Sequence, residues 1–146
     1  MTDTLALSKI LRLRETEKKD AQKRYEQSTR TFEEIATELF QLLKKKEKAE
    51  DSYDHHIKQS SQIETIREQL SYIDVLNGKI IALQQDVQVA REKMENHQEK
   101  LTHAHVEVKK YETIIRRREW AHEKQLARIE TNMMDEASTQ QYLKNR

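Results

Sequence analysis

The chain has one glycine, no proline and no cysteine among its 146 residues, and aromatic residues make up only 5%. Turns between the elements of a globular domain depend on glycine, proline and asparagine, because other residues resist the backbone angles that turns need. The scarcity of these residues argues against a fold of many short elements. A single glycine also excludes a P-loop or a dinucleotide fingerprint, since both place backbone close to phosphate. We find no catalytic constellation, and expect a protein that is not an enzyme and uses no cofactor.

The absence of cysteine excludes a disulfide scaffold and a thiolate metal site, and it suits a reducing compartment. None of the six histidines has another histidine four residues away, so they do not predict a metal site on a helix. No apolar run approaches the ~18 residues that suggest a membrane span. The first twenty residues lack a basic segment and an uninterrupted apolar core, so we expect no signal peptide. A soluble cytoplasmic protein is the prediction.

What the chain does have is charge and helical periodicity. Charged residues make up 36% and hydrophobic residues 35%, and 27 Lys and Arg nearly cancel 26 Asp and Glu. This balance argues against a dedicated nucleic-acid binder. The apolar residues recur at helical spacing, which argues against disorder. The composition predicts an all-α protein of long helices.

Two heptad tracks organise these helices. A repeat of seven with apolar a and d positions is typical of a coiled coil, because it keeps one seam facing a partner helix. We place Leu11, Phe32 and Leu39 at position a, and Leu7, Ile35 and Leu42 at position d. The first track comprises Leu7, Leu11, Arg14, Lys18, Ala21, Tyr25, Ser28, Phe32, Ile35, Leu39, Leu42, Lys46, Ala49 and Tyr53. The second comprises Ile73, Leu76, Ile80, Leu83, Val87, Ala90, Met94, His97, Leu101, Ala104, Val108, Tyr111 and Ile115.

The segment between the tracks predicts a hinge. Ser61 stands three residues before Glu64, which is the spacing of a capping box, and serines are poor in helix interiors. We therefore expect a single elongated coiled-coil domain over 1–146, with helices over about 4–58 and 62–135, a hinge at 59–61 and a frayed C-terminal tail. The alternative position for a break between the helices is Gly78. The second track, however, keeps its heptad spacing on both sides of this residue. We expect the helix to continue there, with a local bend as the alternative.

The two tracks can pair as an antiparallel hairpin. Paired residues then have numbers that sum to a constant, and a sum of 122 puts Phe32 opposite Ala90 and centres the turn on residue 61. In this register several large residues meet small ones, as dense packing prefers. A slip of one heptad gives a sum of 115 and centres the turn near Ile57, before the serines. We prefer 122, and 115 stays open.

The second helix is predicted to overhang the first. If the first helix begins near Thr4, its partner in the preferred register is Arg118, and later residues have no mate. The apolar stripe slips at this point: after Ile115 it restarts on a shifted phase, which is a four-residue stutter. The shifted stripe comprises His122, Leu126, Ile129 and Met133. The remaining 28 residues, 119–146, are the predicted overhang. With the adjoining arginines, we call residues 116–145 the arm.

Two groups of residues are candidates for binding. Arg116 and Arg117 flank Trp120 on the arm, and Arg and Trp are enriched where partners bind. The lysines of 44–48 predict only a solvated helix face. A ridge beside the seam has the spacing 4, 3, 4, and by spacing alone it predicts the edge of the core. It consists of Tyr72, Leu76, Lys79 and Leu83.

The stretches "LSKILRLRETEKKDAQKRYEQSTRTFEEIATEL", "LTHAHVEVKKYETIIRRRE" and "MDE" resemble the FliJ family, a small component of the bacterial flagellar protein-export apparatus. The resemblance spans essentially the whole chain. It implies an antiparallel coiled coil similar to the central stalk of rotary ATPases, which binds the hexameric export ATPase and the membrane-embedded export gate and handles export chaperones. It also implies a location at the inner face of the cell membrane, at the flagellar base.

The resemblance gives the candidate residues roles. Together with the arm's composition, it makes Arg12, Arg14, Arg116, Arg117 and Trp120 candidates for binding the ATPase ring. The family's gate-binding positions match Tyr72, Leu76, Lys79 and Leu83. Lys79 stands where the family usually has a small residue, and Leu83 where other members have a polar ring, so the gate contact is the weaker expectation.

Two other interpretations stay open. A parallel homodimeric coiled coil without an ATPase partner would also show heptads, although the capped hinge and the complementary layers disfavour it. The segment "LALSKILRLR" could form an amphipathic helix on a membrane surface, but Glu15 and Glu17 follow at once. We expect the free chain to be monomeric. We expect it neither to bind nucleic acid nor to insert directly into a membrane.

Overall fold

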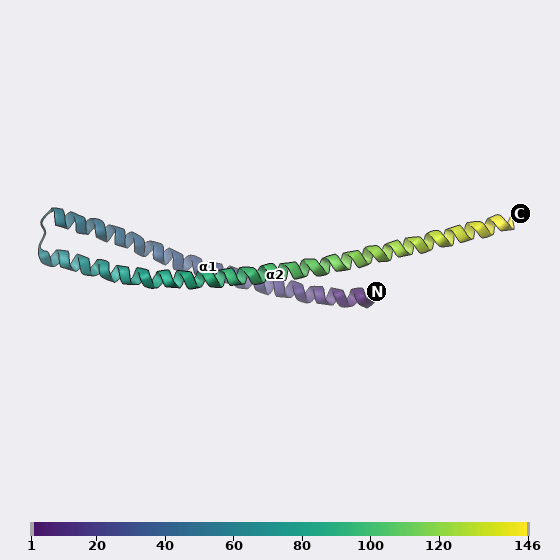
Figure 1. The fold of residues 1–146 in the computed structure, drawn as a ribbon, viewed down its shortest axis with the longest axis horizontal. Helices are drawn as coiled ribbons and strands as arrows, with labels where there is room; N and C mark the ends of the chain where they lie inside the picture. Colours follow the sequence, from purple (N-terminus) through teal and green to yellow (C-terminus); the bar gives the residue numbers. More distant parts are fainter. Residues whose placement is uncertain (1, 146) are drawn as a thin grey trace. The chain divides into compact units, whose positions relative to one another are not determined.

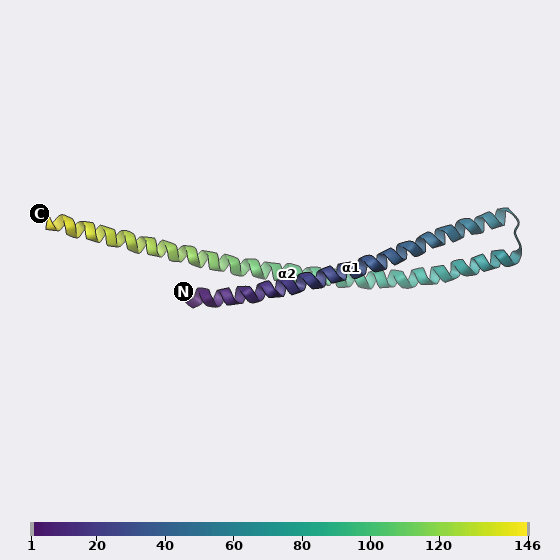
Figure 2. The same cartoon turned by 180° about the vertical axis from the view of Figure 1, so that it is seen from behind.

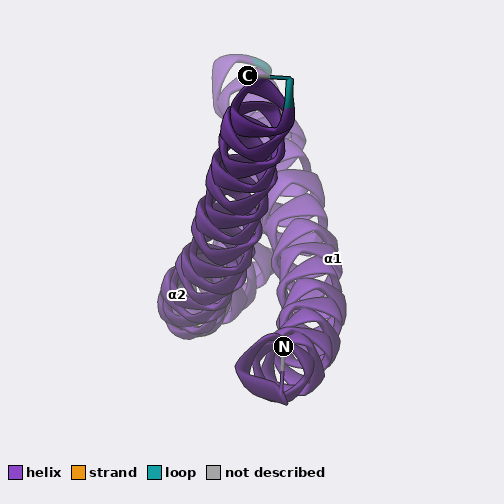
Figure 3. Cartoon of the chain, turned by 90° about the vertical axis from the view of Figure 1, so that its right-hand side faces the viewer, coloured by secondary structure: helices purple, strands orange, loops and turns teal. Residues whose placement is uncertain are grey.

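The computed structural model describes residues 2–145, which form two long α-helices. The helices are α1 (Thr2–Lys58) and α2 (Ile63–Lys144), and no strand occurs within the described residues (Figure 1, Figure 3). The predicted all-α class is confirmed, with the two helices packed against each other. This follows from a sequence rich in helix-forming Lys, Glu, Leu, Gln and Ala and free of proline.

The chain divides into two compact units, a division that the heptad pattern did not suggest. One unit joins the described residues up to Lys19 to those from Thr102 onward, and the other comprises residues 20–101. In the second unit α1 and α2 run in opposite directions, joined by the turn (Figure 1, Figure 2). In the first unit, the described part of α2 continues past the beginning of α1 (Figure 2).

Both heptad tracks coincide with the residues that the structure buries. Every residue of the first track is half-buried. In the second track each residue is half-buried or buried, and its buried members are the whole buried core of the described chain. These are Ile73, Leu76, Ile80, Ala90 and Val108. A seam of a and d positions therefore holds each unit together, as expected for knobs-into-holes packing.

Contacts between the helices show the register within each unit. In the 20–101 unit, Gln69 Nε2 donates to Ser52 Oγ at 3.0 Å, and their numbers sum to 121. The guanidinium carbon of Arg91 lies 5.8 Å from the centroid of the Phe32 ring, and these numbers sum to 123. In the other unit, Arg14 Nε lies 4.0 Å from Glu107 Oε2, again a sum of 121. All three contacts therefore fit the register in which paired residue numbers sum to about 122, and not the register slipped by one heptad, with a sum of 115.

The turn differs in detail from the predicted capping box. Ser60 has a φ of 55°, and its N–H donates to the carbonyl of Ile57, while the N–H of Ser61 donates to the carbonyl of His56. These two bonds around a left-handed residue form a Schellman motif, which ends α1. Ser61 does not start α2, because that helix begins at Ile63. Its hydroxyl lies 2.9 Å from His56 Nδ1 instead.

The helix bounds also differ at the C-terminal side. Residues 59–62 lie outside both helices, and α2 continues to Lys144 where we expected fraying after about residue 135. The helix passes through Gly78 without a break. A Cβ atom built at Gly78 would meet nothing within 4 Å, so packing does not require a glycine there.

Candidate partner-binding surfaces

The arm is a helical segment whose side chains are exposed along its whole length. Tyr111 and Ile115 are half-buried, whereas every residue from 116 to 145 is exposed. The change occurs where the apolar stripe shifts phase. On the shifted stripe, Leu126 is 47% and Met133 65% exposed. An isolated helix gains most of its stability from packing its apolar face, so this stripe is a surface suited to a partner.

The arginines and the tryptophan of the arm lie on this uncovered segment. Arg116 and Arg117 are exposed, and Trp120 is 61% exposed. The ammonium of Lys124 lies 4.3 Å from the centroid of a Trp120 ring, one turn away, in a cation–π contact. A large aromatic side chain beside cationic groups is the composition of a binding hot spot. All three predicted residues are therefore accessible to a partner.

A groove joins the beginning of α1 to the arm, and sequence reasoning missed it. It has a volume of about 550 Å³ and is lined on α1 by Thr4, Leu5 and Ser8. On α2 its lining residues are Arg118, Glu119, Ala121, His122 and Gln125. The predicted overhang began at Arg118, but α1 flanks this groove as far as Gln125. The beginning of α1 and residues 118–125 of α2 therefore offer one composite surface, to which the exposed Leu5 contributes apolar area.

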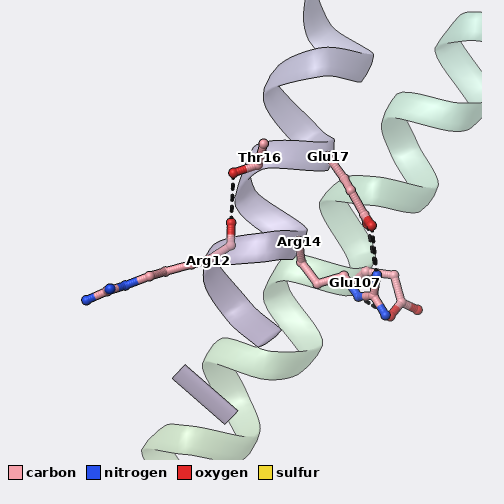
Figure 4. A network of polar contacts seen from close by, with 5 residues as sticks. All are labelled: Arg12, Arg14, Thr16, Glu17 and Glu107. Atoms are coloured by element: carbon pink, nitrogen blue, oxygen red, sulfur yellow. Dashed lines mark hydrogen bonds and ion pairs between the residues drawn. The ribbon is translucent and has the colours of Figure 1, made fainter. Parts of the chain in front are cut away.

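Arg12 and Arg14 occupy different environments although both were predicted to bind the ATPase ring. Arg12 points away from α2, while Arg14 reaches toward it (Figure 4). One guanidinium nitrogen of Arg14 lies 3.0 Å from both carboxylate oxygens of Glu17. The guanidinium also lies 5.8 Å from the centroid of the Tyr111 ring. Arg14 is thus engaged inside its own unit, and only Arg12 points outward.

The carboxylate of Glu17 raises the pKa of Arg14, mainly through their hydrogen bond and then through their charges. A raised pKa of a base stabilises the folded form below that pKa, and the stabilisation is lost only as pH rises through it. For an arginine this window lies far above physiological pH. The guanidinium therefore stays charged, and its buried Nε makes no hydrogen bond although Glu107 lies nearby.

The four positions matched to gate binding are split between surface and core. Tyr72 is 51% exposed and Lys79 is exposed, so both can meet a partner. Leu76 is only 3% exposed and Leu83 is half-buried, so these two pack in the seam. Tyr72 also lines a groove of about 430 Å³ with Lys45, Lys48, Ala49, Ser52, Glu68 and Gln69. The accessible part of the ridge is therefore Tyr72 and Lys79.

The described residues carry neither a metal-binding cluster nor a membrane-spanning stretch. Among residues 2–145, no group of three or more His, Cys, Asp and Glu side chains is arranged to hold a metal ion. Neither helix contains a stretch apolar enough to cross a membrane within the part of the chain that the structure describes. The arm, the groove and the ridge carry the residues predicted from the sequence to bind partners.

Comparisons with known proteins relate the chain to one protein family. The family model of the flagellar FliJ protein matches residues 3–146. The flagellar FliJ protein of Bacillus subtilis (strain 168) is 29% identical over 135 residues, which cover 92% of each chain. The search of solved structures gave no match. Because the family model spans nearly the whole chain, the chain belongs to the flagellar FliJ family, whose members are components of the flagellar export apparatus.

Proposed function

We propose that this chain is a stalk-like coiled coil that binds the export ATPase ring and the export gate, couples energy to export and assists the handling of export chaperones. The observation that carries the proposal is the match of the FliJ family model to residues 3–146. The family is a structural component of the export apparatus and not a known enzyme. On this proposal the chain acts at the cytoplasmic side of the flagellar base.

The arm and the adjoining groove are the proposed ring-binding surface. Arg116, Arg117 and Trp120 supply charge and aromatic area, and the uncovered stripe supplies apolar area. Arg12 joins them because it points outward, whereas Arg14 would first have to leave Glu17. A ring pore that receives this surface would bury the apolar area, which contributes roughly 25 cal/mol per Å².

The ring proposal is tested by phosphate release from the cognate export ATPase, measured while this chain is titrated in. We expect the full chain to raise turnover. A chain ending after Gln125 keeps the groove but loses Leu126, Ile129 and Met133, and we expect it to raise turnover less. The combined changes Arg116→Glu, Arg117→Glu and Trp120→Ala should also lower the effect.

The control is the pair Lys23→Glu and Arg30→Glu, two exposed cations in the 20–101 unit that repeat the two charge reversals. This variant should activate the ATPase as the native chain does. If the native chain leaves turnover unchanged, ring binding is wrong for this family member. If the control variant loses as much ATPase activation as the arm variants, the loss comes from the change in net charge, and the arm is not the binding surface.

Gate binding is proposed for Tyr72 and Lys79. Binding of the cytoplasmic part of the export gate protein should weaken with Tyr72→Ala and with Lys79→Glu. Val106→Ala is the control, because Val106 is a comparably exposed side chain in the other unit. Leu76 is not a useful test position, since a change in the core would lower stability and binding together. Equal binding by all three variants would remove this surface from the proposal.

A homodimeric coiled coil without an ATPase partner is the second candidate, and the uncovered stripe of the arm favours it. Sedimentation velocity of the full chain decides between the candidates. One 17.5 kDa chain per particle at all concentrations excludes the homodimer. A stable dimer that leaves ATPase turnover unchanged would favour it over the stalk.

A further inference from the structure

The seam of the 20–101 unit is widened by apolar residues on one side only. The heptad of α1 has Leu39 at a and Leu42 at d, and that of α2 has Ile73 at a and Leu76 at d. In these frames several e positions, which adjoin the seam, also hold large apolar residues. They are Leu43 and Ile57 on α1, and Ile63 and Leu70 on α2, and all four are exposed. A two-helix seam needs only a and d, whereas a third apolar position in each heptad is typical of helices in larger bundles.

The other side of the same seam is polar. Its g positions hold Lys45 and Ser52 on α1, and Tyr72 and Lys79 on α2. Lys45, Ser52 and Tyr72 line one groove together, which shows that the g positions of the two helices meet on one side. The e positions of the two helices therefore meet on the opposite side.

The widening is also limited along the helices. Farther from the turn, the e positions of this unit carry polar side chains, with the half-buried Ala36 between the two regions. The polar positions are Gln22 and Thr29 on α1, and Gln84, Arg91 and Gln98 on α2. Apolar e positions are thus a local feature of the turn-proximal half and not a general property of this coiled coil.

Two further apolar residues extend this side. Phe40 and Ile81 occupy b positions, which lie next to e on a helix, and they are 57% and 59% exposed. Their numbers sum to 121, so in the observed register they lie at the same level. The ammonium of Lys44 lies 4.6 Å from the centroid of the Phe40 ring. We define the e-side face as Phe40, Leu43, Ile57, Ile63, Leu70 and Ile81.

The charged residues on the e and b positions around this face are mostly acidic. Glu47, Glu50, Asp54 and Asp74 occupy them, against the single cation Arg67. Glu50 pairs with the half-buried Lys46 at 3.8 Å across one helical turn, and a partly exposed pair of this kind neutralises the charge of Glu50 only in part. The polar side of the seam instead carries Lys45, Lys48 and Lys79 with one carboxylate, Glu68. The two sides of this unit therefore differ in both charge and apolar content.

We propose that the e-side face binds an amphipathic helix of a partner protein, whose apolar stripe is flanked by lysine or arginine. Such a helix would lie lengthwise between α1 and α2 and complete a three-helix arrangement, as in other helix-in-groove complexes. The acidic rim selects a basic partner and disfavours anionic lipid and nucleic acid. This inference goes beyond the proposed function, because it uses none of the residues assigned to the ATPase ring or the gate.

The test measures binding of a fluorescently labelled synthetic peptide of about three heptads, with leucine at a and d and lysine beside them. A peptide with glutamate in place of lysine is the charge control. Anisotropy is recorded against the full chain and two double variants. Phe40→Gln with Ile81→Gln changes the e-side face. The control variant is Val75→Gln with Val89→Gln, which changes two apolar residues at c positions, away from the e-side face. Their side chains are 54% and 52% exposed, nearly as much as those of Phe40 and Ile81.

We expect the lysine peptide to bind and the glutamate peptide not to bind. The change on the e-side face should weaken binding by about tenfold or more, and the control change by less than about twofold. Glu47→Lys with Asp54→Lys should weaken binding at low salt, where charge attraction is strongest. Because all the replaced side chains are exposed, helix content by circular dichroism should stay equal and show that each variant folds.

Three results would overturn the proposal. The first is no binding of the lysine peptide, and the second is equal binding of both peptides. The third is concentration-dependent self-association of the native chain that the e-side change abolishes and the control change does not. That result would assign the e-side face to a second copy of this chain.

Discussion

Two stretches of α2 carry apolar heptad stripes, yet only one of them is covered. Between Ile73 and Ile115 each stripe residue is buried or half-buried against α1. Between Arg116 and Lys144 the stripe continues on a shifted phase, and every residue is exposed. The same periodicity thus makes a core in one stretch and a binding surface in the other. The difference depends on whether α1 supplies a facing helix.

The largest expected difference between the two stretches is in amide hydrogen exchange. Every residue of the arm is exposed, and isolated helices are marginal in water. We expect amides of 126–144 to exchange roughly a hundredfold faster than those of 76–90, because local opening is cheap where few contacts are lost. Within α1, 32–42 should be better protected than 7–18, where Arg14 and Lys18 interrupt the seam. Mass spectrometry of peptides measures both contrasts, and an arm as protected as the seam would contradict them.

The next effect compares one leucine in each stretch. Leu76→Ala removes a side chain that is 3% exposed and should lower the free energy of unfolding by about 3 kcal/mol, through lost burial and a cavity. Leu126→Ala removes one that is 47% exposed and should cost less than about 1 kcal/mol. Urea unfolding followed by circular dichroism measures both. Equal losses would mean that the arm is packed in solution.

The turn between the helices allows a smaller test. Ser60 adopts a left-handed backbone with a φ of 55°, which costs a residue with a side chain about 1 kcal/mol relative to glycine. Ser60→Gly should therefore raise the free energy of unfolding by about 1 kcal/mol, less the entropy that glycine adds to the unfolded chain. Gln59→Gly, one residue earlier and at ordinary φ, is the control and should lower stability. A loss in both variants would contradict the left-handed cap.

The smallest effect concerns helix propensity at Gly78. Gly78→Ala should stabilise the chain by up to about 1 kcal/mol, since alanine is the better helix former and its Cβ would meet nothing within 4 Å. Ala82→Gly, an exposed position one turn later, should cost a similar amount. Ala127→Gly on the arm should leave the main unfolding transition unchanged, because the arm unfolds locally. Thermal unfolding of the three variants measures these changes in stability, and it compares the covered stretch of α2 with the arm directly.

Several features of the fold and of the candidate surfaces could be predicted from the spacing of residues. The seam, the all-α class and the phase shift after Ile115 follow from apolar positions that repeat along one helix. The ridge that contains Tyr72 could not be separated into surface and core, because spacing places Leu76 both on this ridge and in the second track. The partners of Arg14 could not be predicted either, since its contacts with Glu107 and Tyr111 come from the other helix.

The sequence by itself determined that this chain forms long helices, which residues make the seam and where the stripe loses its partner. These are consequences of local backbone preference and a seven-residue period, which act within a single helix. Only the tertiary structure decided the Schellman turn at Ser60, the groove beside Leu5, the contacts of Arg14 and the side on which the seam is widened. Those features depend on side chains that meet across two helices, and the pattern of one helix does not contain that information.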